Sequence, residues 1–129
     1  IEVASRENAV IRLEEGKARK KYNAMTGENL IMATMAQSMF MKESEDLAAY
    51  IQEELDPLLD SPNRGLKQAG FYVLIGASMP NVLVEAGFIS NPNEERKLKS
   101  AAYRKKVAKG IYSGIMRFRK SREQALAEG

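Results

Sequence analysis

Apolar residues in the first half of the chain recur every three or four positions, which is the spacing of amphipathic helices. This pattern predicts helices over residues 2–22, 28–41 and 43–59. Gly16 interrupts the first of them, and Thr26 is a suitable N-cap for the second. The third helix carries four apolar residues on one face: Leu47, Ile51, Leu55 and Leu58. A turn sequence containing proline then ends this helical region.

The pattern changes at Phe71, where two short apolar runs replace the helical spacing. Residues 71–75 and 82–87 are rich in β-branched and aromatic side chains and predict two strands. The short connection leaves no room for a parallel crossover, so these strands would pair antiparallel if they are neighbours. Their continuous hydrophobicity predicts burial on both faces of a sheet, yet two strands alone leave both edges open. We therefore expect sequence before Ile1 to complete the sheet.

Helical spacing returns after the second apolar run. Asn91 and Pro92 form a typical helix start, and Ser100 is a suitable cap for the last helix. That helix carries a stripe expected to pack on the sheet: Tyr103, Val107, Ile111, Ile115 and Phe118. The polar tail at residues 121–129 is expected to fray.

Composition limits the chemistry that the chain can perform. With 129 residues, 44% hydrophobic and 29% charged, it has the composition of one soluble globular domain or part of one. No apolar run approaches the ~20 residues of a membrane-spanning helix. The chain has neither Cys nor His, which rules out disulfides and argues against a self-contained zinc enzyme. Its first residue is Ile1 rather than Met, so a processed or truncated start is expected.

The C-terminal third is basic and has no acidic residue between Glu95 and Glu123. One interpretation is a surface for nucleic acid or another anionic polymer. The other, which we favour from the sequence, is the solvated face of a helix. No aromatic residues alternate with the basic ones as a base-stacking surface would require, so no nucleic-acid partner is predicted.

One carboxylate, Glu85, stands inside the second apolar run, between residues 82–84 and 86–89. An ionised carboxylate buried there would need a salt bridge, a metal ion or a proton, because burying it unpaired costs several kcal/mol or more. Proteins keep such groups mostly where they have a task. Without further information, a structural salt bridge is the commoner interpretation, with Arg64 as a candidate partner.

Two segments resemble the C-terminal half of the zinc-dependent N-acetylmuramoyl-L-alanine amidases: RGLKQAGFYVL at 64–74 and MPNVLVEAGFISNP at 79–92. Glu95 and Leu98 continue the match, and SRENAVI at 5–11 is similar to the segment after the family's last metal-binding strand. The resemblance is strong over residues 64–98 and weak over residues 14–60.

This resemblance implies an α/β fold, a three-layer α/β/α sandwich whose central sheet is mostly parallel. Residues 1–129 would be the C-terminal part of one amidase catalytic domain, and its N-terminal strands would be missing from this chain. The family's zinc ion is held by two His and one Glu, which we expect upstream of Ile1, with no metal ligand in this chain. The chain by itself is therefore expected to be inactive.

The resemblance also implies a bacterial cell-envelope enzyme, periplasmic or secreted, that acts on peptidoglycan. The whole enzyme would cleave the amide bond between N-acetylmuramic acid and the L-alanine of the stem peptide. Glu85 matches the family's catalytic glutamate, the general base and acid beside a zinc-activated water. Small neighbours, Ala86 and Gly87, would leave room for a polymer substrate. Arg64 and Gln68 would line the substrate groove, although Arg64 could equally anchor a loop.

Residues 12–45 lie where some family members carry a regulatory helical insert. In those members a carboxylate of the insert blocks the zinc ion until an activator protein binds. Glu14, Glu15 and Glu28 are the candidate blocking residues in this sequence. Asn91 is better explained as a helix cap than as a ligand.

One alternative belongs to a different functional class. The same surface could form a non-catalytic cell-wall binding or regulatory module that lacks the zinc site. The presence or absence of bound zinc separates this alternative from the hydrolase.

Overall fold

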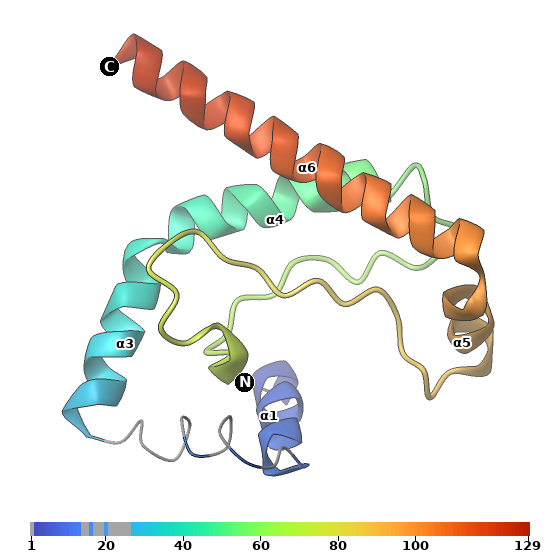
Figure 1. Cartoon of the computed structure of the whole chain (residues 1–129), viewed down its shortest axis with the longest axis horizontal. Helices are drawn as coiled ribbons and strands as arrows, with labels where there is room; N and C mark the ends of the chain where they lie inside the picture. Colours follow the sequence, from blue (N-terminus) through green and yellow to red (C-terminus); the bar gives the residue numbers. More distant parts are fainter. Residues whose placement is uncertain (1, 14–15, 17–19, 21–26) are drawn as a thin grey trace. The chain divides into compact units, whose positions relative to one another are not determined.

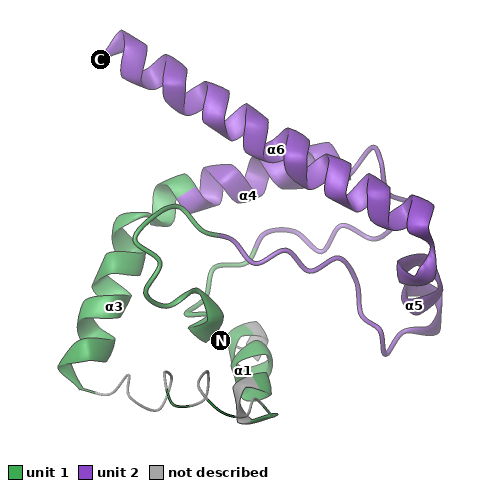
Figure 2. Cartoon of the chain, in the orientation of Figure 1, with its two compact units in different colours: residues 1–43, 67–81 green, residues 44–66, 82–129 purple. Residues whose placement is uncertain are grey.

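The structure is a computed structural model that describes residues 2–13, 16, 20 and 27–129 (Figure 1). It divides into two compact units (Figure 2), one of residues 1–43 with 67–81 and one of residues 44–66 with 82–129. The helices are α1 (Glu2–Ala9), α3 (Glu28–Met39), α4 (Met41–Leu55), α5 (Pro92–Lys99) and α6 (Ala101–Glu128), with 3₁₀ turns at Val10–Leu13 and Tyr72–Leu74. No helix in the described part of the chain combines the length and hydrophobicity that crossing a membrane requires.

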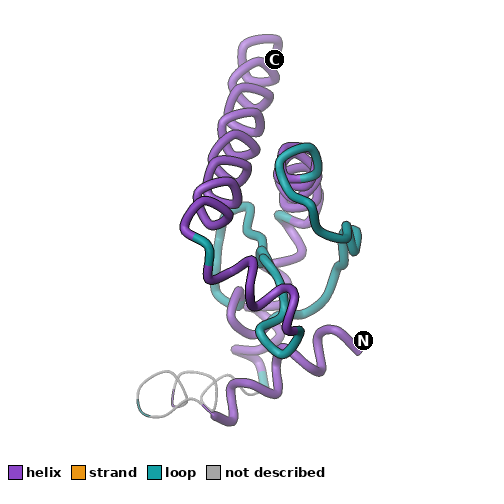
Figure 3. Tube along the Cα trace, turned by 90° about the vertical axis from the view of Figure 1, so that its right-hand side faces the viewer, coloured by secondary structure: helices purple, strands orange, loops and turns teal. Residues whose placement is uncertain are grey.

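The described residues contain no strand, and Figure 3 shows only helices and loops. The predicted α/β/α sandwich with a central, mostly parallel sheet is therefore wrong for this structure. Where a strand was predicted at residues 71–75, the backbone forms a 3₁₀ turn. The amide of Leu74 donates to the carbonyl oxygen of Phe71 at 3.0 Å, and the amide of Ile75 donates to that of Tyr72 at 3.1 Å. These local bonds occupy donors that a strand ladder would need.

The second predicted strand is extended but has no ladder in the described structure. Val82 and Val84 pack against the core of the second unit, whereas Leu83 and Glu85 are exposed. This alternation is the two-residue period of an extended chain with one covered face, so the prediction of burial on both faces is also wrong. An apolar run specifies which side chains avoid water, but a strand needs a second extended backbone as well.

The core of the second unit lies where α4 and α6 meet (Figure 1). Leu47, Ile51 and Leu55 of α4 are buried together with Val107 of α6. The helix and the apolar face predicted here are confirmed from Leu47 to Leu55, but the helix ends at Leu55, so Leu58 lies beyond it. The apolar stripe of α6 packs on α4 instead of on a sheet, with Ile111 and Phe118 partly buried against the same core.

Two glycines let α6 approach α4 closely. A Cβ atom added to Gly114 would lie 2.5 Å from the Cα atom of Ile51, and one added to Gly110 would lie 2.4 Å from Cδ2 of Leu55. The first distance involves backbone, which cannot move aside as a side chain can. The helix crossing therefore depends on the absence of side chains at these two positions.

The predicted caps of the last two helices are confirmed. The Asn91 side chain caps α5, which has Pro92 at its start, and the Ser100 hydroxyl accepts a hydrogen bond from the Tyr103 amide at 3.3 Å. The tail expected to fray is helical, because α6 continues to Glu128. Arg104 closes the junction of α5 and α6 by donating to the carbonyl oxygens of Leu98 and Lys99, both at 2.8 Å.

The first unit is held by few buried side chains. Ile75 is buried, but α3 contains no buried residue. Asn8 of α1 joins two distant parts of the sequence: its side chain donates to the carbonyl oxygen of Gly70 at 2.9 Å and accepts from the amide of Tyr72 at 2.8 Å. Helix α3 begins at Glu28 with Gly27 as its N-cap, and Thr26, the predicted cap, lies outside the described residues.

Candidate functional site

The second unit contains a buried carboxylate, but it belongs to Glu94 rather than Glu85. Glu94 is 8% exposed and is the only buried charged residue among those described. One carboxylate oxygen, Oε1, accepts a hydrogen bond from Nη2 of Arg64. The other, Oε2, accepts from the backbone amide of Phe88 at 2.5 Å. Both oxygens of the buried carboxylate therefore have a donor, as burial of an ionised group requires.

The sequence around α5 explains why Glu94 occupies this position. The Asn91 side chain accepts hydrogen bonds from the amides of Asn93 and Glu94 at 3.0 and 3.2 Å, which fixes the first turn of the helix. A turn between Phe88 and Asn91 connects the helix to the extended segment, with a 3.0 Å bond from the Asn91 amide to the Phe88 carbonyl oxygen. A carboxylate in the first turn is also favoured by the helix dipole.

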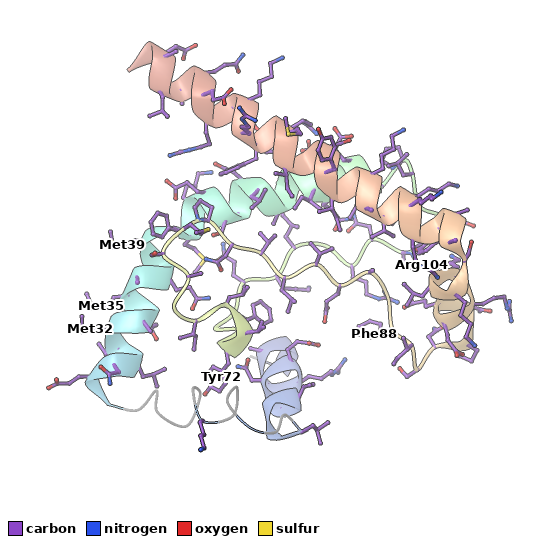
Figure 4. All side chains as sticks on the ribbon, viewed as in Figure 1. Met32, Met35, Met39, Tyr72, Phe88 and Arg104 are labelled. Carbon is purple, nitrogen blue, oxygen red and sulfur yellow. The ribbon has the colours of Figure 1, made fainter. Side chains whose placement is uncertain are left out.

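Phe88 and Gly87 complete the surroundings of Glu94. The guanidinium carbon of Arg64 lies 4.9 Å from the centroid of the Phe88 ring, a cation–π contact (Phe88 is labelled in Figure 4). Gly87 has a φ of 155°, and a Cβ added there would lie 3.3 Å from Oε2 of Glu94 and 3.5 Å from Cδ1 of Leu98. The small size of Gly87, attributed above to room for substrate, is accounted for by its packing against α5.

The electrostatics of this cluster keep Glu94 ionised. The hydrogen bond from Arg64 lowers the pKa of Glu94 most, and the Phe88 amide lowers it further. Desolvation by burial acts in the opposite direction but does not prevail. Glu94 is thus a negative anchor at neutral pH and not a group poised to exchange protons near pH 7.

Glu85 lies on the same extended segment, three residues before Phe88, and its side chain is exposed. It shares the outward face with Leu83, while Val82 and Val84 face the core. The premise that an apolar run buries Glu85 is wrong, because in an extended chain alternate residues point to opposite sides. Its predicted role stays a prediction. Chemically, a water-accessible carboxylate on a segment anchored at one end can accept a proton from a nearby water.

The other predicted site residues fall in different places. Arg64 is bound to Glu94, which agrees with the alternative that Arg64 anchors a loop. The partner of Arg64 in this ion pair is therefore Glu94 and not Glu85. The predicted contact of Arg64 with substrate stays a prediction. The Arg64 side chain is 50% exposed, so part of it can still be reached from solvent. Gln68 is exposed and belongs to the first unit. Its substrate role also stays a prediction.

The candidate blocking residues are only partly visible. Glu14 and Glu15 lie outside the described residues, and Glu28 is exposed in the first turn of α3. Nothing in the structure tests the regulatory insert at residues 12–45.

The residues that the structure describes do not fit a zinc site. The sequence lacks His and Cys, and in the described ranges no three Asp or Glu side chains are grouped closely enough to hold a metal ion. The His and Glu ligands expected upstream of Ile1 stay a prediction.

Sequence reasoning missed the most constrained side chain of the site. From the sequence, only the helix start at Asn91 and Pro92 was predicted, and Glu94 was given no role. The available signal was an acid in the first turn of a helix capped by Asn91, where the helix dipole favours a negative charge. The ion-pair partner of Glu94, Arg64, is distant in sequence, and that pairing carries no such signal.

Comparisons with known proteins agree with the family resemblance. The sequence profile of the N-acetylmuramoyl-L-alanine amidase family matches residues 17–117. The N-acetylmuramoyl-L-alanine amidase AmiA of Escherichia coli is 34% identical over 116 residues, which is 90% of this chain and 39% of that protein. The germination-specific N-acetylmuramoyl-L-alanine amidase of Bacillus subtilis is 42% identical over 77 residues, or 59% of this chain and 32% of that protein.

A third relative, the N-acetylmuramoyl-L-alanine amidase LytC of Bacillus subtilis, is 43% identical over 75 residues, or 58% of this chain and 15% of that protein. This chain thus spans well under half the length of these curated relatives. No solved structure gives a significant match.

Proposed function

Because this chain belongs to the N-acetylmuramoyl-L-alanine amidase family, we propose that it contributes the proton-transfer carboxylate of a peptidoglycan amidase. The bond cleaved is the amide between the lactyl group of N-acetylmuramic acid and the L-alanine of the stem peptide. The observation that carries this proposal is the family match over residues 17–117, which includes Glu85 and its neighbours.

In this proposal Glu85 acts in both halves of the hydrolysis. As the oxygen of a water molecule bonds to the amide carbon, the Glu85 carboxylate accepts the water proton. When the carbon–nitrogen bond breaks, the protonated carboxyl gives that proton to the leaving nitrogen. The products are a lactyl carboxylate and the amino group of L-alanine, and Glu85 returns to its ionised form. The exposure of Glu85 supports this role, because the carboxylate must reach both water and a polymer.

The cluster around Glu94 would position Glu85 for this task. It ties the backbone amide of Phe88, three residues along the same extended segment, to α5 and Arg64. A proton-transfer group needs a well-defined position relative to its substrate. Glu94 and Arg64 are therefore proposed as positioning residues, and neither needs to contact the reacting atoms.

Zinc enters no step assigned to this chain, because its residues do not fit a zinc site. We expect the purified chain to carry no stoichiometric zinc, which elemental analysis by mass spectrometry measures directly. Zinc bound one to one would contradict this expectation.

Peptidoglycan is the proposed substrate, and the bacterial cell envelope, periplasmic or secreted, is the proposed location. The relatives' names support the substrate, since they describe amidases of N-acetylmuramoyl-L-alanine, and the location follows from where peptidoglycan lies. An activator protein is part of the proposal only through the regulatory insert at residues 12–45. If that insert is inhibitory, deleting residues 14–45 from the longer amidase raises its activity, and unchanged or lost activity would contradict it.

The experiment that tests the proposed reaction is product analysis on purified peptidoglycan. The longer protein that contains this sequence should release stem peptides with a free L-alanine amino terminus, identified by mass spectrometry. One free lactyl carboxylate should appear on the intact glycan strands for each peptide released. Release of any other peptide or sugar terminus would overturn the assigned bond.

A non-catalytic cell-wall binding module is the second candidate for this chain. The lack of His and Cys favours it, because the isolated chain has no fitting set of zinc ligands. This chain alone is expected to be inactive in either case, so the test incubates the longer protein that contains it with purified peptidoglycan. Sedimentation with the polymer without any new amino termini supports a module, whereas release of L-alanine termini supports the hydrolase.

A further inference from the structure

The outward side of α6 combines lysines with exposed apolar residues. The buried residues of this helix are Val107, Gly110 and Gly114, so its opposite side points away from α4. Four residues follow that opposite side at helical spacing: Lys105, Lys109, Tyr112 and Met116. They are separated by four, three and four positions, which places them on one line along the helix. We refer to these four residues as the outward row.

Three arginines of α6 have partners within the chain, whereas Lys105 and Lys109 form no ion pair among the described residues. Arg117 pairs with Glu53 at 2.8 Å, and Arg119 pairs with Glu123 at 2.8 Å. Arg104 is bound to the carbonyl oxygens at the end of α5. In the part of the chain that the structure describes, no carboxylate lies within ion-pair distance of Lys105 or Lys109. The positive charge of the outward row is therefore not neutralised internally.

Three apolar residues on this side of α6 are exposed to water, and exposure of apolar side chains is unfavourable. Tyr112 is 64% exposed, and Ile115 and Met116 beside it are exposed as well. At ~100° per residue, Ile115 lies next to Tyr112 on the flank of the outward row, and Lys106 lies on the opposite flank. The face of α6 that the core leaves uncovered thus carries Lys105, Lys106 and Lys109 and, towards the middle of the helix, the exposed Tyr112, Ile115 and Met116.

We propose that this face of α6 binds the surface of an anionic phospholipid bilayer. A helix lying in the interface inserts apolar side chains among the acyl chains and keeps its lysines at the lipid phosphates. Both components are present here on one face of a 28-residue helix. A hydrated anionic polymer would use the lysines but would leave Tyr112, Ile115 and Met116 in water. Nucleic acid would require a series of stacking aromatics, which the outward row lacks.

Vesicle binding tests this proposal and does not depend on any enzymatic activity. The full chain is mixed with vesicles of equal parts phosphatidylglycerol and phosphatidylcholine, or with phosphatidylcholine vesicles, and the bound fraction is measured by sedimentation. We expect binding to the anionic vesicles that weakens as salt rises, and at least tenfold weaker binding to the neutral ones. Equal binding to both kinds of vesicle, or binding to neither, would overturn the proposal.

Two variants and one control assign the binding to this face. Lys105→Glu with Lys109→Glu should weaken anionic binding by about tenfold or more, and Tyr112→Ser with Met116→Ser should weaken it at every salt concentration. The control, Lys20→Glu with Lys67→Glu, makes the same charge change at exposed lysines of the first unit. An equal loss in the control would show a net-charge effect and overturn the assignment. Circular dichroism verifies that each variant keeps its helices. Binding to DNA without binding to anionic vesicles would overturn the proposal.

Discussion

Helices α3 and α4 have similar apolar spacing but opposite surroundings. In α4 the apolar face is buried, with Leu47, Ile51 and Leu55 in the core of the second unit. In α3 no residue is buried, and Met32 and Met39 are 69% and 76% exposed along the row labelled in Figure 4. The two helices differ in what faces them, because α6 packs on α4 with Val107 and two glycines. Periodicity thus predicts that a helix forms, but a facing element decides whether its apolar side is covered.

The largest expected effect comes from emptying the covered face. Ile51→Ala should lower the free energy of unfolding of the second unit by about 2–5 kcal/mol, because it leaves a cavity under α6. Met35→Ala in α3 is the control and should change it by less than about 0.5 kcal/mol. Denaturant unfolding followed by circular dichroism measures both. Equal losses would contradict the difference between the two helices.

The next effect comes from filling the helix crossing. Gly114→Ala puts a Cβ against the backbone of Ile51 and should destabilise the second unit by about 1–3 kcal/mol, although alanine favours helix formation. Ser113→Ala changes the neighbouring position of the same helix without adding a Cβ at the crossing. Thermal unfolding measures the stability of both variants. A Gly114→Ala variant more stable than Ser113→Ala would contradict the close approach of the two helices.

Losing the Asn91 cap should have a smaller effect. Asn91→Ala removes the acceptor for the amides of Asn93 and Glu94 and should cost about 1 kcal/mol. Asn93→Ala, an adjacent and exposed position, serves as the control. A loss in Asn93→Ala as large as that in Asn91→Ala would argue against the cap.

The effect of Glu94 should depend on pH. The folded chain holds the pKa of Glu94 below its ordinary value of 4.5, so the folded state binds this proton less readily than the unfolded state. The stabilisation by Arg64 and Phe88 is therefore present above about pH 4.5 and is lost as the pH falls through the lowered pKa. Glu94→Gln should remove this acid-dependent part of the unfolding free energy.

Glu95→Gln is the matched control for that measurement, since Glu95 pairs with Lys99 near the surface. Thermal unfolding between pH 3 and pH 7 distinguishes the two variants. If Glu94→Gln kept the wild-type dependence on acid, the buried ion pair would not be the cause.

The parts of the fold that depend on local sequence were predictable. Asn91 with Pro92, Ser100 and the face of α4 each follow from residues close in sequence, and the structure confirms them. The strands were not predictable in this way. At residues 71–75 and 82–87 the apolar pattern predicted strands buried on both faces, which is wrong, because strand pairing depends on another backbone that the pattern does not contain.

The candidate site was predictable only in its location. The family resemblance directed attention to Glu85 and Arg64, but the buried ion pair joins Arg64 to Glu94, 30 residues away. Such a pairing is a tertiary contact with no periodic signal. Gly110 and Gly114 were missed for a related reason, because a glycine in a helix reveals its role only when the facing helix is known.

The most direct test of the account is the rate at which Glu85→Gln releases L-alanine amino termini from peptidoglycan, measured in the longer amidase that contains this sequence. The amide keeps the size of the side chain but cannot accept the water proton. We expect a loss of at least about a hundredfold in turnover, with unchanged thermal unfolding, whereas the Glu95→Gln control keeps its rate. Turnover by Glu85→Gln at the wild-type rate would contradict the assignment of Glu85.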